Sequence, residues 1–263
     1  AQQLFEPHPF NYVNFKFGMQ LVFWGLFKKL VIADRLKIAV DSIFAQGSGF
    51  EGLSIVVGIL FFSFQMYCDF SGGIDIARGI AEAMGINLVQ NFKRPFFSRS
   101  IDEYWRRWHI TLGSWMRDYV FYPLSLSKAF TRIGRVSRKY FGRYIGKVFP
   151  TMIATVITFL AVGLWHGPYW KYVAFGLYYG FLISLGMLIA PLTQKMSQRW
   201  KINTKRFPWP FLSMVLVFSL TTFARYFVRA DGFRHALFLL PKTFSSFNPQ
   251  IFFDGTLLQL GLI

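Results

Sequence analysis

The chain has 263 residues, of which 54% are hydrophobic and 16% are charged. Soluble domains usually carry about a quarter charged residues, so this composition argues against a soluble domain and indicates a membrane protein. The formal net charge is +17, but Lys and Arg cluster between apolar runs. That clustering is typical of membrane proteins and requires no nucleic-acid partner. Cys68 is the single cysteine, which excludes an intrachain disulfide.

The first part of the chain predicts helices at and through a membrane interface. Residues 1–13 are polar and should form a surface segment. Residues 15–44 have a helical pattern, but their uncharged core is too short to cross, so we expect a helix that lies in or dips through the interface. A Gly-rich turn at 46–52 then precedes an uncharged run, 52–68, at the lower length limit of a spanning helix.

Two carboxylates follow this run, in Asp69-Phe-Ser-Gly-Gly-Ile-Asp75. Two glycines beside two acids at membrane depth predict a broken helix, which is tolerated only where protein or a water-filled cavity surrounds it. Asp69 or Ser71 could cap the restarting helix, and Asp75 could pair with Arg78. Buried charges are costly, so we expect either structural ion pairs or a functional site here.

The segment from Ser98 to Tyr122, SRSIDEYWRRWHITLGSWMRDYVFY, is the one around which the rest is organised. A basic loop, 90–99, leads into it. Ser100 and Glu103 match a capping box, and the large apolar residues recur at helical spacing: Trp105, Trp108, Leu112 and Trp115. We predict one amphipathic helix from 100 to 121. It is either an interfacial helix with Trp at headgroup depth or a helix that lines a polar pocket with His109 facing it.

Three uncharged runs in the second half are long enough to cross a bilayer: Val148–Trp170, Tyr172–Gln194 and Phe207–Ala224. Gly176, Gly180 and Ser184 should form a face for close helix packing. Two basic segments without acids, Ser127–Lys147 and Lys195–Arg206, read as loops. Two crossings separate them, so both should face the cytoplasm, either against anionic headgroups or solvated.

The remaining C-terminal part fits this simple topology less well. Arg225, Arg229 and Arg234 follow the third run, where the crossing count expects no cluster of cations. Residues 241–263 should form a loop and the opening of another apolar helix. The predicted fold class is all-α: a polytopic transmembrane helical bundle with broken or re-entrant and interfacial amphipathic helices.

Two histidines lie in segments that a membrane would surround. His166 ends an apolar run in Gly-Leu-Trp-His-Gly-Pro. A buried imidazole tends to stay neutral and can then act as a general base, whereas the alternative is a histidine hydrogen-bonded at a helix corner. No acid or cysteine lies three or four residues after His109 or His166, so we expect no metal site. We predict that the two approach a common polar cavity, to which 69–75 contributes.

Four segments stand in order along the chain: QMYCDFSGGIDIARGIAEAMGI, NFKRPFFSRSIDEYWRRWHITLGSWMRDYVFYPL, GLWHG and, as a weaker match, FVRADGF. They resemble the membrane-bound O-acyltransferase (MBOAT) family, in the bacterial alginate O-acetyltransferase and teichoic-acid D-alanyl transferase branch, from about Phe10 to about Leu240. The resemblance implies an MBOAT-like core with a tunnel that holds a catalytic His166 and a second histidine, His109. The family's Gly-Gly after Tyr-x-Pro-Leu is replaced by Ser125-Leu126-Ser127 and a longer basic loop.

The resemblance implies that the chain lacks the first several and the last few helices of a complete family member. We therefore expect residues 1–263 to be a single membrane domain, the central part of the family's fold, from a multi-pass protein of the bacterial plasma membrane. The resemblance implies O-acyl transfer. An acetyl or D-alanyl group would pass from a cytoplasmic activated donor to a hydroxyl of an exported polysaccharide or cell-envelope polymer.

His166 would take the hydroxyl proton, and His109, an arginine or backbone amides would stabilise the oxyanion. The donor would be an acyl-CoA or an acyl-carrier-protein thioester, used as co-substrate without a tightly bound cofactor. The expected partners are this donor or carrier protein, the envelope polysaccharide or an extracytoplasmic acyl-transfer protein, and membrane lipids. Candidate substrate-binding residues are Trp105, Arg106, Arg107, Arg117, Asp118, Trp165, Asp69 and Asp75.

Two other classes of protein stay open at this point. A membrane transporter or channel would also use broken helices and intramembrane charges, but it predicts repeated halves, which the sequence does not show. A non-catalytic membrane scaffold would keep the helices and would have no need of His166.

Overall fold

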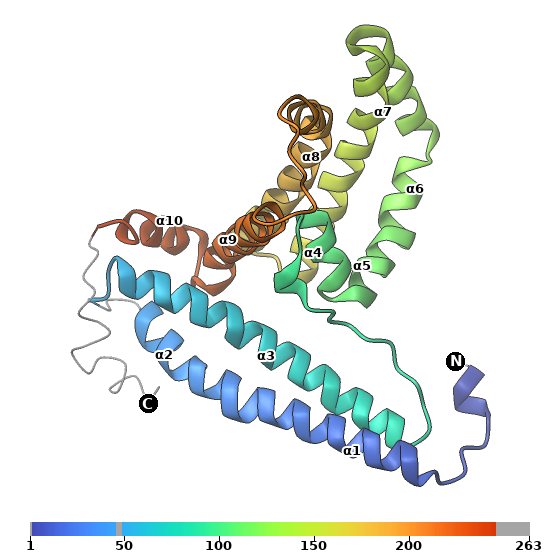
Figure 1. Cartoon of the computed structure of the whole chain (residues 1–263), viewed down its shortest axis with the longest axis vertical. Coiled ribbons are helices and arrows are strands. Elements are labelled where there is room, and N and C mark those ends of the chain that lie inside the picture. Colours follow the sequence, from blue (N-terminus) through green and yellow to red (C-terminus); the bar gives the residue numbers. More distant parts are fainter. Residues whose placement is uncertain (1, 46–48, 246–263) are drawn as a thin grey trace. The chain divides into compact units, whose positions relative to one another are not determined.

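The computed structural model describes residues 2–45 and 49–245, and these residues form helices and connecting loops without a β-strand (Figure 1). The predicted all-α class is thereby confirmed. The chain divides into two compact units, residues 1–92 with 234–263, and residues 93–233. The single membrane domain remains a prediction.

Four helices of the described chain are long and apolar enough to cross a membrane: α3 (Leu53–Ala83), α7 (Lys128–His166), α8 (Trp170–Arg199) and α9 (Trp209–Arg229). A hydrocarbon core of about 30 Å needs about 20 helical residues, and the apolar part of each helix approaches or exceeds that length. The prediction of a multi-pass membrane protein is therefore confirmed, and each predicted apolar run lies within one of these helices or extends slightly past its end.

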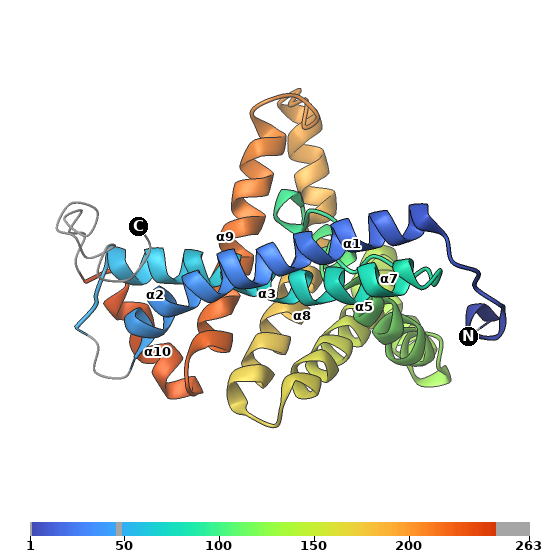
Figure 2. The same ribbon diagram turned by 90° about the horizontal axis from the view of Figure 1, so that it is seen from below.

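The first unit consists mainly of two long helical rods side by side (Figures 1 and 2). After a short 3-10 turn, η1 (Gln2–Phe5), Asn11 caps α1 (Tyr12–Leu26) by accepting hydrogen bonds from Val13 and Asn14. The π-helical segment η2 (Phe27–Ala33) and α2 (Asp34–Phe44) continue α1 without interruption. The helix predicted for 15–44 is thus confirmed, and it packs antiparallel to α3.

Two glycine pairs set the closest approach of α1 and α3. A Cβ atom on Gly25 would lie 2.6 Å from the carbonyl oxygen of Gly72, and one on Gly18 would lie 2.5 Å from that of Gly79. Both contacts are too short for any larger residue, so the glycines are required by the approach of the two backbones.

A matched pair of substitutions tests this contact. Gly72→Ala should destabilise the protein by about 1–3 kcal/mol, because its Cβ would meet the Gly25 carbonyl oxygen at 2.8 Å. A Cβ on the neighbouring Gly73 would have no other side chain or facing backbone within 4 Å, so Gly73→Ala should be neutral or stabilise the helix by up to about 1 kcal/mol. Thermal unfolding in detergent measures both, and equal effects would contradict this packing.

The helix predicted to break at 69–75 does not break. α3 runs from Leu53 to Ala83, so neither Asp69 nor Ser71 caps a restarting helix. The prediction was wrong because Gly72 serves the contact with α1, and because lysines of η2 neutralise the two carboxylates. Lys28, only 6% exposed, binds Asp75 at 2.6 Å and Ser71 at 3.0 Å.

The expected structural ion pairs are therefore present. Asp75 also accepts from Arg78, as predicted, at 3.4 Å, and Asp69 binds Lys29 at 2.7 Å. α10 (Phe233–Lys242) ends against the start of α3, where the amide of Gly52 donates to the carbonyl of Lys242 at 2.8 Å. The predictions for 46–48 and for most of 241–263 lie outside the described residues.

The second unit is built on α7, α8 and α9. α7 and α8 pack antiparallel and at close range, since a Cβ on Gly176 would collide with the carbonyl oxygen of Phe159. Ser184 donates to the carbonyl of Met152 at 3.3 Å, so the predicted small-residue face does pack against a helix. The shorter elements before α7 are η3 (Pro95–Phe97), α4 (Ile101–Arg107), α5 (Ile110–Met116), η4 (Arg117–Phe121) and α6 (Tyr122–Ser125).

The two basic segments are more helical than predicted. Ser127 caps α7 by accepting from the amide of Phe130, so 128–147 is helix rather than loop, interrupted at Gly142 (φ 81°, ψ 178°). α8 likewise continues to Arg199 before the chain turns. A helix satisfies its own backbone hydrogen bonds. A charged segment near a membrane surface can therefore be helical as well as a loop.

Candidate active site

The central segment starts with the predicted cap. The Ser100 hydroxyl accepts from the amide of Glu103 at 3.1 Å, which starts α4. The Glu103 carboxylate reaches back one residue further than in the usual box, accepting from the amide of Arg99 at 2.7 Å. The predicted N-cap at Ser100 is thus confirmed, and it supplies the amide of Glu103 with the partner that a helix start requires.

The single helix predicted for 100–121 is wrong, because the segment breaks at Trp108 and His109. Trp108 is extended (φ −109°, ψ 125°) and His109 is left-handed (φ 48°, ψ 55°), after which α5 begins. A left-handed residue other than glycine costs roughly 1–2 kcal/mol, so tertiary contacts must maintain it. The Trp108 side chain, 7% exposed, stacks on Tyr104 with ring centroids 5.7 Å apart.

This break places His109 beside the last turn of α7. The ring centroids of His109 and Trp165 are 5.9 Å apart, and those of Trp165 and His166 are 4.9 Å apart. Two histidines separated in sequence by α5, η4, α6 and α7 are therefore brought to one indole. His166 also lies beside two aromatic rings, Phe175 at 5.7 Å and Tyr172 at 5.9 Å between ring centroids, and its side chain is exposed.

Burial, and secondly the proximity of His166, lowers the pKa of His109 from its usual 6.5. Below about pH 6.5 the unfolded chain binds a proton at His109 more readily than the folded chain does. The contribution of the neutral His109 to the stability of the fold is therefore complete above about pH 6.5 and is lost as the pH falls through the depressed folded pKa. With four histidines in the chain, nitrogen-15 NMR can resolve their titrations, and His109→Gln assigns this one. A His109 titration at or above 6.5 would contradict this environment.

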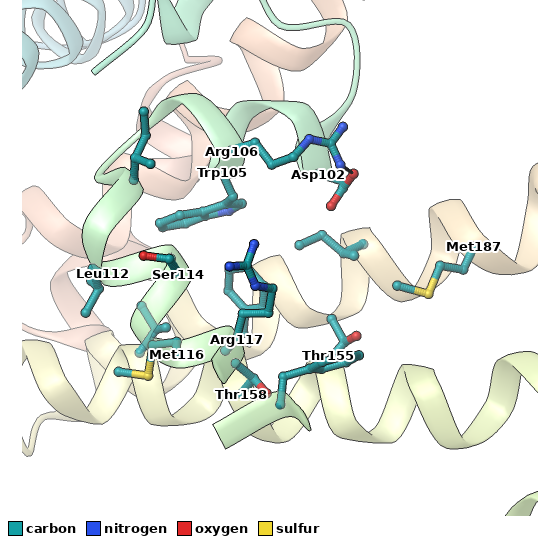
Figure 3. Close-up of a pocket in the computed structure, with 16 residues that line it drawn as sticks. Asp102, Trp105, Arg106, Leu112, Ser114, Met116, Arg117, Thr155, Thr158 and Met187 are labelled. Carbon is teal, nitrogen blue, oxygen red and sulfur yellow. Dashed lines mark hydrogen bonds and ion pairs between the residues drawn. The ribbon is translucent and has the colours of Figure 1, made fainter. Parts of the chain in front are cut away.

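A pocket of about 440 Å³ opens between α4, α5, α7 and α8 (Figure 3). Its wall is largely apolar, and Trp105, Arg106 and Arg117 are the sequence-predicted substrate-binding residues that line it. Figure 3 shows Arg117 in the middle of the lining residues, between Trp105 and Thr158. Neither histidine lines this pocket. The predicted common polar cavity is therefore not this one, although the two rings do come close together.

The other predicted substrate-binding residues have separate surroundings. Arg107 binds Glu103 at 2.6 Å and points along α4, and Trp165 lies between the two histidines. Asp118 accepts a hydrogen bond from Nε of Arg117 at 2.9 Å, but it does not itself line the pocket. Asp69 and Asp75 belong to the first unit, where they form the ion pairs described above.

Two features of the pocket suit an anionic ligand with an apolar body. The Arg106 guanidinium pairs with Asp102 on the same exposed helix face, and such exposed pairs are weak enough to exchange for a ligand. The indole Nε1 of Trp105 is buried and has no hydrogen-bond partner in the described chain, which leaves a donor for a ligand acceptor.

Sequence reasoning missed Arg225 of α9. Its side chain is 3% exposed, and its guanidinium donates to the Tyr104 hydroxyl at 3.2 Å and to the Thr222 hydroxyl at 3.5 Å. The guanidinium carbon lies 5.3 Å from the ring of Phe96 and 5.8 Å from that of Trp108. Arg225 therefore contacts Trp108, the residue that directly precedes His109, and helps to fix its position.

A signal for this role was present in the sequence, because Arg225 was one of the arginines that did not fit the crossing count. The cluster is thoroughly desolvated: burial raises the pKa of Tyr104 to about 12, against the opposing effect of Arg225. Among residues 2–45 and 49–245, no group of three or more His, Cys, Asp or Glu side chains is placed to hold a metal ion.

Comparison of the sequence with known proteins shows which proteins the chain is similar to. The chain is 32% identical over 219 residues to the probable alginate O-acetylase AlgI of Pseudomonas syringae pv. tomato, covering 83% of this chain and 37% of that protein. It is 31% identical over 231 residues to the peptidoglycan O-acetyltransferase of Helicobacter pylori, covering 88% and 39%. It is 32% identical over 129 residues to the teichoic acid D-alanyltransferase of Streptococcus thermophilus, covering 47% and 28%.

The chain thus spans less than half the length of these relatives. The sequence model of the membrane-bound O-acyltransferase family matches residues 2–137 and 142–225, which include α1 to α6, nearly all of α7, all of α8 and most of α9. Because this match covers most of the chain, and because relatives that share its segments bear the family's activities in their names, the chain belongs to the membrane-bound O-acyltransferase family.

Proposed function

We propose that this chain is the catalytic core of an acyltransferase that moves an acetyl or D-alanyl group from a cytoplasmic thioester to a hydroxyl group. The acceptor would be an exported polysaccharide, a cell-envelope polymer or an extracytoplasmic acyl-transfer protein. The observation that carries the proposal is the exposed imidazole of His166 at the end of α7, with Trp165 and His109 beside it. The acceptors named for the relatives, alginate, peptidoglycan and teichoic acid, support an envelope polymer.

The proposed reaction needs one base and one oxyanion donor. His166 takes the proton of the acceptor hydroxyl as the oxygen attacks the thioester carbonyl carbon. The tetrahedral intermediate collapses, the carbon–sulfur bond breaks, and the protonated imidazole returns its proton to the leaving thiolate. His109 is kept neutral by its surroundings, so it can donate one N–H to the oxyanion without carrying a charge of its own.

The pocket between α5 and α7 is the proposed site for the donor arm. An apolar wall with Arg106 and Arg117 suits a flexible chain that ends in a phosphate, as acyl-CoA and acyl-carrier proteins provide. Trp105 would contribute its unpartnered N–H to an amide carbonyl of that arm. The continuous α3 does not provide the broken helix at 69–75 that a transporter interpretation would use.

Deletion of the gene that encodes the full-length protein tests the proposal in the cell. Envelope polymers of the deletion strain should lose ester-linked acetyl or alanyl groups, detected by mass spectrometry after mild alkaline release. Complementation with the wild-type gene should restore them, and complementation with the His166→Ala gene should not. An unchanged ester content in every polymer fraction would overturn the proposal.

We further infer that the protein lies in the bacterial plasma membrane with both basic segments on the cytoplasmic side. Thr131 and Thr204 are exposed and can be changed to cysteine, one at a time, in a Cys68→Ser background. A membrane-impermeant maleimide should label both positions only from the cytoplasmic side, because Lys and Arg are retained there. Labelling of the two positions from opposite sides would contradict this topology.

A further inference from the structure

The start of α7 forms a compact helical hairpin, residues 128–147, which we call the cationic hairpin. The helix from 128 to 141 turns at Gly142, whose φ of 81° is a left-handed conformation that favours glycine. The chain then folds back on itself so closely that a Cβ on Gly146 would collide with the Cα of Arg138. Figure 1 shows this turn at the free end of α7. The tight packing makes the hairpin a defined surface.

The hairpin carries seven cations and no acid: Lys128, Arg132, Arg135, Arg138, Lys139, Arg143 and Lys147. All seven are exposed, and none is paired with a carboxylate in the described part of the chain. The spacing of Lys128, Arg132, Arg135 and Lys139 puts four of them on one helix face, where like charges repel. Arg106 and Arg117, which precede α7, differ because each has a carboxylate partner. An anion from outside the described chain would relieve this repulsion.

Large apolar side chains are exposed on the same hairpin. Tyr140 is 71% exposed, Phe141 is 68% exposed, and Val136 and Tyr144 are also exposed. Aromatic rings interleaved with Lys and Arg are typical of segments at the boundary between headgroups and acyl chains. The apolar part of α7 begins directly after Lys147, so a membrane that surrounds α7 has its headgroups at the level of the hairpin.

Most of the hairpin lies within the part of the chain that the family model matches. Only residues 138–141, which directly precede the turn at Gly142, fall in the gap between the two matched ranges. None of the hairpin's cations lines the proposed donor pocket, so a lipid contact there would be separate from the acyl-transfer step proposed above.

We propose that the cationic hairpin binds the phosphates of anionic membrane lipids, with its aromatic residues inserted at the headgroup boundary. The chemical class of the ligand is a phosphodiester headgroup with a net negative charge, such as that of phosphatidylglycerol. An acidic soluble protein would satisfy the charges, but it gives no reason for exposing Tyr140 and Phe141 beside the start of a membrane span. The proposal is independent of which acyl group or acceptor the protein uses.

The test uses the full-length protein in nanodiscs of phosphatidylcholine with an increasing fraction of phosphatidylglycerol. A fluorophore that responds to polarity is attached at Thr131→Cys in a Cys68→Ser background. Its emission should rise with the anionic fraction, and high salt should reverse the rise because exposed ion contacts are screened. The quadruple change Lys128→Gln, Arg132→Gln, Arg135→Gln and Lys139→Gln should reduce this response by about fivefold or more.

Two controls separate charge from folding and from overall electrostatics. Removing the same number of charges elsewhere, by Arg199→Gln, Lys201→Gln, Lys205→Gln and Arg206→Gln, should leave the response within about twofold of the starting protein. Arg132→Lys with Arg135→Lys keeps the charge and should keep the response. Equal losses in the two quadruple variants, no response to phosphatidylglycerol, or a larger response to a soluble acidic carrier protein in pure phosphatidylcholine would each overturn the proposal.

Discussion

In the full-length protein, His166→Ala should lower kcat of acyl transfer by about a hundredfold to ten-thousandfold, the usual loss when a positioned general base is removed. The KM for the donor should change little, because the proposed donor pocket is lined by other residues. The His166 ring is exposed at the end of α7, so its removal should leave expression and thermal stability close to those of the wild type.

The matched control for this prediction is His8→Ala. His8 is an exposed histidine of the N-terminal segment, in the first unit, and its ring is hydrogen-bonded with the carbonyl of Gln3. His109→Ala separates two roles for the second histidine: a loss as large as that of His166→Ala indicates oxyanion stabilisation, and a smaller loss indicates orientation of a substrate. Near-normal kcat in purified His166→Ala protein would contradict the mechanism.

Arg225→Met should destabilise the second unit by about 2–3 kcal/mol and also lower acyl transfer. The change removes hydrogen bonds from a charged donor to the buried hydroxyls of Tyr104 and Thr222, and it removes the cation between the rings of Phe96 and Trp108. Without it, Trp108 is free to move, and the left-handed conformation of His109 loses its support.

Arg225→Lys should give an intermediate result, because lysine keeps the charge but cannot form the planar fork that contacts two hydroxyls and two rings. The matched control is Arg132→Met, an exposed cation whose loss should change stability by no more than about 0.5 kcal/mol in a neutral detergent. Thermal unfolding in that detergent measures all three variants. Equal stability of Arg225→Met and Arg132→Met would contradict the role assigned to Arg225.

The features that the sequence predicted well are those decided by local composition. Uncharged length predicted all four candidate spans, because crossing a hydrocarbon core requires a continuous apolar helix. The Ser100 cap and the Asp75–Arg78 pair were predictable because their partners are three residues apart on a helix. The proximity of His109 and His166 was predicted from the resemblance and from the cost of placing an imidazole in a membrane.

The wrong predictions concern features that distant contacts decide. Gly72 and Gly73 suggested a break in α3, but Gly72 is needed for the approach of α1, which local sequence does not reveal. The helix through His109 breaks because Trp108 packs against Tyr104 and Arg225, and Arg225 lies more than a hundred residues further along. The charges around Gly142 suggest a solvated loop, although the helical spacing of the cationic hairpin is present in the sequence.

Transfer of a labelled acyl group by the purified full-length protein tests the central claim most directly. The protein would be reconstituted in liposomes with a donor thioester labelled in its acyl group and an extract of the cell's own envelope polymers. The account predicts that free thiol and alkali-labile label on polymer appear together, in equal amounts, and that both depend on His166. Release of thiol without labelled polymer, or labelling that persists in His166→Ala protein, would contradict it.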